Sequence, residues 1–565
     1  MKNVSPVIIL PGINHSPVYL YDENDNPVTD ESGKKTGGTL MIPDTAAFKE
    51  KLPALAKALA ASIVTRKADG IYEKAYDCAA AVSRIQQCDS DGDFINNLKP
   101  ERWYYPVSEM DDELKGWAYR MVPMQALTKE IGEDKLFFFT FNLVGDPLDS
   151  AKELQEYIKF VKEYSGSEKV SFLPVSLGGT ILTAYLSLYE ADDIDRIVNV
   201  VACLDGTDIV GDIFARDFDT SDLFLRHEFI PAIFREETGD ALPGYGINIL
   251  LHTIPDSAFS AFLSGFMSGI LDTLMLNCPQ IWAMLPSYRY DGLRERYLTG
   301  DEHARLRERT DAFQKARLTL KDSLLKAAES GVKIDYIAGS GLDFGDVEYC
   351  YFAAVKSKSR YNTDGIINLS SCTLGAHGAP RGKTLPASYI SEREREGKGE
   401  YISPDRRVDV STALMPDNTW VFLNQHHEVG KNNAVLNLAK SIITGEVENV
   451  HSDPVNYPQF NRGANTYVLR RWKSGDGARV LEEIRDGSLR TAPSVKAQLE
   501  KAVSESEQVL GATVGDAHRA SKALKDIEKI LVRLGKAPEP QSQSEIRKLL
   551  CKTAEGLSRI MIRRK

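Results

Sequence analysis

Short apolar runs alternate with helical patterns over much of the chain. Five runs are nearly continuous in apolar, branched and aromatic residues, and they cover residues 7–10, 135–141, 169–175, 196–202 and 333–338. Continuous apolar strands are typical of a parallel sheet whose two faces are both covered by helices. A helical pattern over residues 149–164 fits between two of them. We therefore predict an α/β fold with a mostly parallel sheet.

Two long segments interrupt this alternation. Residues 15–134 separate the first two strands and contain a helical pattern over 45–64. Residues 208–330 form the second segment, whose apolar middle is broken by Pro255, Gly265 and Gly269. This composition predicts a mostly helical insertion. It fits a lid over an acyl pocket, and it fits an ordinary helical subdomain with its own core equally well.

Apolar residues recur at helical spacing again near the end of the chain, for example at Val495, Leu499 and Val503. We therefore expect a core made of residues 1–207 and 331–445, a cap over 208–330 and a C-terminal helical extension over 446–565. The extension could pack on the core, join two copies of the chain or touch a membrane surface, and its role stays open.

Composition narrows the class of protein. Of 565 residues, 42% are hydrophobic and 26% are charged, and the formal charge of −11 argues against a nucleic-acid partner. The seven cysteines show no metal-ligand spacing and are expected to be reduced, with a Cys78–Cys88 pair as the alternative. Neither a signal-peptide core nor an uninterrupted apolar run of about 18 residues is seen. A cytoplasmic protein is therefore expected.

The strand over residues 169–175 runs directly into Ser176, and Gly178, Gly179 and a helical pattern follow. This order is that of a nucleophile elbow, in which a serine lies on a sharp turn between strand and helix. The Leu177 amide would then face a developing oxyanion. The usual G-x-S-x-G pattern has glycine where this chain has Pro174, and the alternative is an ordinary loop with an incidental serine.

A serine nucleophile needs a histidine base and an acid that orients it, and in this fold they follow the serine in the order acid, then histidine. Asp364, in a polar loop after the strand at 333–338, is the preferred acid, and Asp343 is the alternative. His427 is the preferred base because it precedes the Asn432-Asn433 pair that opens a helix. His426 is the alternative base.

The second oxyanion donor is expected from the loop after the first strand. Leu10, Pro11 and Gly12 end that strand, and the glycine lets the backbone approach a substrate. The amide of Ile13 is the predicted donor. A plain strand-ending turn would look the same.

A metal hydrolase is the remaining catalytic alternative. Residues 89–93, which read Asp-Ser-Asp-Gly-Asp, are the main acidic cluster. They lack the later glutamate of a calcium loop and have no histidine nearby. We therefore predict neither a metal nor another cofactor.

Together the motifs resemble the lecithin:cholesterol acyltransferase-like branch of the α/β-hydrolases, which includes lipases, phospholipases and acyltransferases. The matching residues lie in four motifs and a short apolar run: Leu10-Pro11-Gly12 with His15-Ser16-Pro17, Ser176 to Gly179, Thr363 to Ile367, His427 with Asn432-Asn433, and Ile281 to Pro286. The resemblance covers roughly residues 1–210 and 330–445. It implies an α/β-hydrolase fold and chemistry on a serine.

The resulting interpretation is a serine esterase or lipase that cleaves carboxylic esters of lipid-like acyl groups through an acyl-enzyme on Ser176. The alternatives are O-acyl transfer to an alcohol and a non-catalytic binding protein with a hydrolase fold. The expected partner is a small-molecule or lipid ester, with contact to a membrane surface as a further interpretation. The acyl length, the alcohol and the oligomeric state are not predicted.

Overall fold

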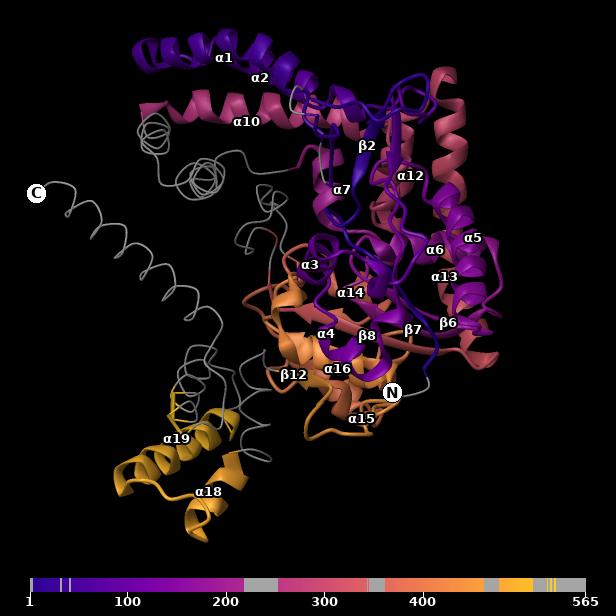
Figure 1. The fold of residues 1–565 in the computed structure, drawn as a ribbon. Coiled ribbons are helices and arrows are strands. Elements are labelled where there is room, and N and C mark those ends of the chain that lie inside the picture. Colours follow the sequence, from indigo (N-terminus) through magenta and orange to yellow (C-terminus); the bar gives the residue numbers. More distant parts are fainter. Residues whose placement is uncertain are drawn as a thin grey trace, which may run out of the picture. The chain divides into compact units, whose positions relative to one another are not determined.

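The computed structural model describes residues 4–30, 33–39, 42–217, 253–342, 344, 361–461, 477–511, 526, 529–530 and 533–534 (Figure 1). The chain divides into two compact units, residues 1–461 and 462–565. The first unit holds the large sheet and the candidate site.

A seven-stranded sheet in which every strand pairing is parallel forms the centre of the first unit. Its strands, in spatial order, are β12 (Phe460–Asn461), β11 (Thr419–Leu423), β8 (Lys333–Ser340), β7 (Ile194–Val200), β6 (Val170–Pro174), β1 (Val7–Leu10) and β5 (Leu136–Phe138). This sheet confirms the predicted α/β class and its likeness to the α/β-hydrolase fold. It extends to Asn461, past the expected end of the core at residue 445.

Helices cover both faces of the sheet, as the continuous apolar strands predict. On one face, α6 (Gly178–Leu188) contacts both α5 (Pro147–Ser165) and α13 (Ala304–Glu329) (Figure 1). Alternate strand residues such as Ile8, Leu10 and Phe172 share one buried cluster with these helices. The other face is covered by α16 (Asn433–Ile443), which packs on β7 and β8 beside α4 (Gln125–Ile131).

The first long insertion folds into a small antiparallel sheet and four helices. The sheet has the order β3 (Gly37–Gly38), β2 (Val18–Tyr21), β4 (Asn97–Pro100). The helices are α1 (Thr45–Thr65), α2 (Ile71–Val82), α3 (Asp112–Met121) and α4. The helix expected over 45–64 is therefore confirmed.

The second insertion is helical where it is described, and residues 218–252 lie outside the described part. Its helices are α7 (Asp208–Ala215), α10 (Asp256–Ile270), α11 (Pro279–Ala283), α12 (Ser287–Tyr297) and α13, with a π turn over Leu271–Met275 after α10. Because α13 covers the sheet, the end of this insertion belongs to the core layers rather than to a separate cap.

Helix α10 runs along α2, and α1 packs on the other side of this pair (Figure 1). The expected breaks at Gly265 and Gly269 are wrong, because the helix continues through both. A Cβ at Gly265 would overlap the carbonyl oxygen of Tyr72, and one at Gly269 would lie 2.7 Å from that of Tyr76. The glycines therefore serve the close approach of two helices.

Among the described helices, one stretch is long and apolar enough to cross a membrane by length and composition. It covers Asp256–Met275 with a mean hydropathy of 1.3, and 44% of its most apolar window is buried. Its contacts with α2 are those of a core helix. Helix α10 of the second insertion therefore packs with α1 and α2 of the first insertion, and together they form a small second hydrophobic core, the satellite core.

Short elements connect β8 to β11 and complete the first unit. They are α14 (Leu369–Thr373), β9 (His377–Gly378), α15 (Ala387–Arg395) and β10 (Val408–Asp409), the two strands pairing antiparallel. In the second unit, α18 (Gly477–Arg485) and α19 (Pro493–Gly511) contact each other. Helix α19 contains the predicted helical residues Val495, Leu499 and Val503.

Candidate active site

Ser176 occupies a sharp turn between β6 and α6. Its φ is +52°, a conformation that a residue with a side chain rarely adopts. Two backbone hydrogen bonds hold it there: the Ser176 amide donates to the Val200 carbonyl at 3.2 Å, and the Cys203 amide donates to the Ser176 carbonyl at 2.8 Å. This geometry is that of a nucleophile elbow.

The two glycines after Ser176 are required by packing. A Cβ at Gly178 would overlap the carbonyl oxygen of Leu10, and one at Gly179 would lie 2.7 Å from the Cys203 nitrogen. Helix α6 can therefore begin directly against β1 and against the backbone of Cys203 only with glycine at these positions.

Pro174 departs from the usual elbow pattern without breaking the pairing of β6 with β1. The donors on either side of it are used, since Ser171 and Val175 donate to the carbonyls of Pro6 and Leu10 at 2.8 and 2.9 Å. Successive amides of a strand point to opposite sides, so the amide position of residue 174 faces away from β1. The N–H that proline lacks is therefore not needed for the pairing with β1.

Ser176, His427 and Asp364 form one chain of hydrogen bonds. His427 Nε2 lies 2.8 Å from Ser176 Oγ, and Nδ1 lies 2.7 Å from Asp364 Oδ2. The other carboxylate oxygen of Asp364 accepts from the amides of Ile366 and Ile367 at 3.0 and 2.8 Å. Asp364 is fully buried, and its contacts fix the carboxylate so that it orients the imidazole.

The alternative base, His426, takes no part in this chain. The His426 Nδ1 accepts from the amide of Glu428 at 3.0 Å, while the Ser176 hydroxyl faces His427. Asp343 lies outside the described residues.

Gly339, near the end of β8, brings the loops that carry Asp364 and His427 together. A Cβ there would lie 2.7 Å from Asp364 Cβ and 2.6 Å from the Gln425 carbonyl oxygen. The base loop is also anchored by Asn432, whose side chain caps α16 through Ala434 and donates to Gln425. Sequence reasoning missed Gly339, because no local pattern marks a contact between two distant loops.

The two predicted oxyanion donors lie beside Ser176. Within the described part of the chain, the amides of Ile13 and Leu177 have no hydrogen-bond acceptor. A Cβ at Gly12 would lie 3.0 Å from Ser176 Cβ and 3.5 Å from Oγ, so the missing side chain keeps this side of the hydroxyl open. These amides are available to a negatively charged oxygen.

A cavity of about 380 Å³ opens at Ser176 and His427. Its wall is mainly apolar and comes from the loop after β1, the end of α3 and the start of α16. Its apolar members include Met121, Val122, Met124, Leu173, Val429 and Val435. None of the described residues of the second insertion lines this cavity. The interpretation of that insertion as a lid therefore stays a prediction.

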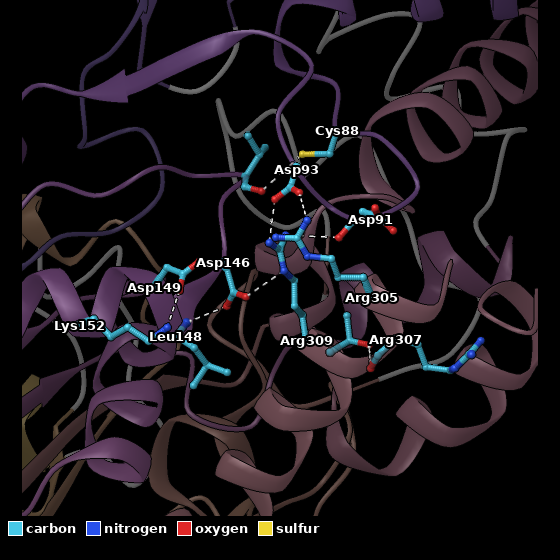
Figure 2. A network of polar contacts seen from close by, with 12 residues as sticks. Cys88, Asp91, Asp93, Asp146, Leu148, Asp149, Lys152, Arg305, Arg307 and Arg309 are labelled. Carbon is cyan, nitrogen blue, oxygen red and sulfur yellow. Dashed lines mark hydrogen bonds and ion pairs between the residues drawn. The ribbon is translucent and has the colours of Figure 1, made fainter. Parts of the chain in front are cut away.

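Two arginines pair with the last aspartate of the acidic cluster at 89–93 (Figure 2). Asp93 pairs with Arg305 and with Arg309, the latter at 2.7 Å, and Asp89 accepts from the amides of Asp91 and Asp93. Where the chain is described, no group of three or more His, Cys, Asp or Glu could hold a metal ion.

The thiol of Cys88, in the same loop, faces Cys278 rather than Cys78. The two sulfur atoms are 3.6 Å apart and both cysteines are buried, while Cys78 lies in the satellite core. The alternative Cys78–Cys88 pair is therefore wrong.

The fold and the arrangement at Ser176 define the class as an α/β fold of the α/β-hydrolase type. No family model and no curated protein match the chain. Among solved structures, the crystal structure of the Tle4–Tli4 complex is similar at 12% identity over 60% of this chain and 75% of that chain. The TM-score is 0.24, a value too low to assign a function to this chain.

Proposed function

We propose that the protein is a serine hydrolase that cleaves carboxylic ester bonds of lipid-like acyl substrates. The observation that carries this proposal is the continuous hydrogen-bond chain from Ser176 Oγ through His427 to the buried Asp364, at the mouth of an apolar cavity.

The geometry supports a two-step reaction. The His427 Nε2 takes the Ser176 proton as Oγ attacks the ester carbonyl carbon, and the resulting oxyanion accepts hydrogen bonds from the Ile13 and Leu177 amides. The C–O bond then breaks, and His427 returns the proton to the departing alcohol. In the second step, water loses a proton to His427 and attacks the acyl carbon. The bond from that carbon to Ser176 Oγ then breaks, and His427 returns the proton to Oγ, which releases the acid and the free serine.

The cavity wall supports an acyl chain as the group that is held. An apolar pocket gains free energy when it buries methylene groups, by about 0.8 kcal/mol for each one. Transfer to an alcohol would use the same acyl-enzyme, with the alcohol in place of water.

The proposal is tested by labelling with a fluorophosphonate, followed by intact mass, and by cleavage of p-nitrophenyl esters of increasing chain length. Ser176→Ala should lose the single adduct and reduce kcat by about a millionfold while the protein stays folded. Ser187→Ala is the matched control, because that serine lies on α6 and donates to the Ala184 carbonyl. An adduct that persists in Ser176→Ala, or folded wild type that cleaves no ester, would contradict the proposal.

A further inference from the structure

His15 is a cavity residue whose polar group the proposed reaction does not use. It follows the oxyanion loop, and it lines the same cavity as Ser176 and His427. Its Nδ1 is shielded from solvent and has no hydrogen-bond partner in the described part of the chain. Buried polar atoms in folded proteins are nearly always paired, so an unpaired one at a cavity wall indicates a missing partner.

The space that Nδ1 borders is also bordered by the nucleophile. A methyl group placed on Gly12 would lie 3.6 Å from His15 Nδ1 and 3.5 Å from Ser176 Oγ. Both atoms therefore face the side of Gly12 that its missing side chain leaves open, and both residues line the cavity there. The glycine leaves the space open, and the histidine provides a polar group at its edge.

The imidazole of His15 is neutral under the conditions in which His427 acts as a base. Burial, and secondarily the charge that His427 carries when protonated, lowers the pKa of His15 to about 4. A neutral imidazole has one N–H donor and one acceptor nitrogen. His15 can therefore offer a hydrogen bond without competing with His427 for the serine proton.

We propose that the Nδ1–H of His15 donates a hydrogen bond to an oxygen of the bound ester and holds the ester against Ser176. Both oxygens of an ester are acceptors, so Nδ1 carries the hydrogen in the bound state. No bond to His15 forms or breaks, and the residue binds and positions the substrate. This inference rests on the proposed function.

Two substitutions separate hydrogen bonding from packing. His15→Phe keeps an aromatic ring and removes both nitrogen atoms. His15→Asn is smaller, but its amide nitrogen can lie where Nδ1 lies and donate the same hydrogen bond. If His15 only fills space, phenylalanine is the better replacement. If it donates to the substrate, asparagine is the better one.

The experiment measures kcat and KM of wild type and both variants on one p-nitrophenyl ester, with melting temperatures as the control for folding. We expect His15→Phe to lose about 10- to 100-fold in kcat/KM and His15→Asn to regain most of it. The reverse order, or equal activity in wild type and His15→Phe, would overturn the inference and leave the proposed function standing. Folded wild type that neither cleaves the ester nor takes the fluorophosphonate label would overturn both.

Discussion

Gly12 is a position at which one added methyl group would reach Ser176. A Cβ on this residue would lie within contact distance of Ser176 Cβ and Oγ. We expect Gly12→Ala to displace the hydroxyl or the ester and to lower kcat/KM by about 100-fold, as a misplacement of about 1 Å does.

The matched control for this prediction is Gly116→Ala, in the middle of α3. A Cβ there meets nothing within 4 Å. Activity should be unchanged, and the free energy of unfolding should rise by about 0.5–1 kcal/mol, because alanine loses less entropy than glycine in a helix. Gly12→Ala with wild-type kinetics would contradict the assigned geometry.

His15 also predicts how stability depends on pH. Its pKa is 6.5 in the unfolded chain and about 4 in the folded protein, so the unfolded state binds the proton first as pH falls. The contribution of His15 is complete above pH 6.5 and is lost as the pH falls from 6.5 to 4, by about 3 kcal/mol in total.

Urea unfolding at pH 7 and at pH 4 measures this loss. The difference between the two pH values should be smaller in His15→Phe by about 3 kcal/mol. His377→Phe, at an exposed histidine, is the control and should keep the wild-type difference. An unchanged difference in His15→Phe would contradict the burial of this ring.

The proposed triad could be named from sequence because each member follows a strand that its apolar run marks. Ser176 stands before a glycine pair, and His427 stands before the asparagines that cap α16. The cavity wall at residues 120–124 could not be predicted in this way. Those residues reach Ser176 through the packing of an insertion, which leaves no periodic signal.

At the scale of elements, Arg309 joins three parts of the chain (Figure 2). It extends from α13, pairs with Asp93 of the acidic loop at 2.7 Å, and lies 3.8 Å from Asp146, which caps α5. Its side chain is 16% exposed, whereas that of Arg305, which also pairs with Asp93, is 54% exposed. Arg309 is therefore the arginine that connects the first insertion, through Asp93, to the core helices α13 and α5.

We expect Arg309→Ala to lower the free energy of unfolding by about 1–3 kcal/mol, because it removes the ion-pair partner of the nearly buried Asp146 and the less exposed of the two partners of Asp93. Arg305→Ala should cost less than about 1 kcal/mol, as exposed ion pairs do. Urea unfolding in low and in high salt measures both. Equal costs for the two variants would show that burial does not set the strength of this contact.

The elements themselves are predictable to different extents. The strands from β1 to β8 in the large sheet can be recognised because they are largely buried and therefore mostly apolar. Strand β12 has two residues, too few for a pattern, and pairs only through its register with Val421 and Phe422. The sequence predicts breaks in α10 because a glycine that permits close packing looks the same in sequence as one that ends a helix.

At the scale of the whole molecule, the division into two units predicts that the first unit, residues 1–461, carries out the proposed reaction without the second. A chain ending at residue 476 keeps all seven strands of the large sheet and every residue of the candidate site, and it lacks α18 and α19. We expect its kcat and KM on a soluble p-nitrophenyl ester to match those of the full chain within about twofold. A folded but inactive truncated chain would assign the C-terminal unit a part in the reaction.

The order of strands in the sheet has a consequence for synthesis on the ribosome. Strand β1 is made first, yet it lies between β5 and β6, so it has no partner in the sheet until residues 136–138 have left the ribosome. Its second edge stays open until residues 170–174 follow, and the serine turn then forms against it. His427, the proposed base, comes last, because it follows β11, which pairs with β8. Such distant pairings fold slowly, and the nascent chain carries an unpaired apolar strand while the whole first insertion is made.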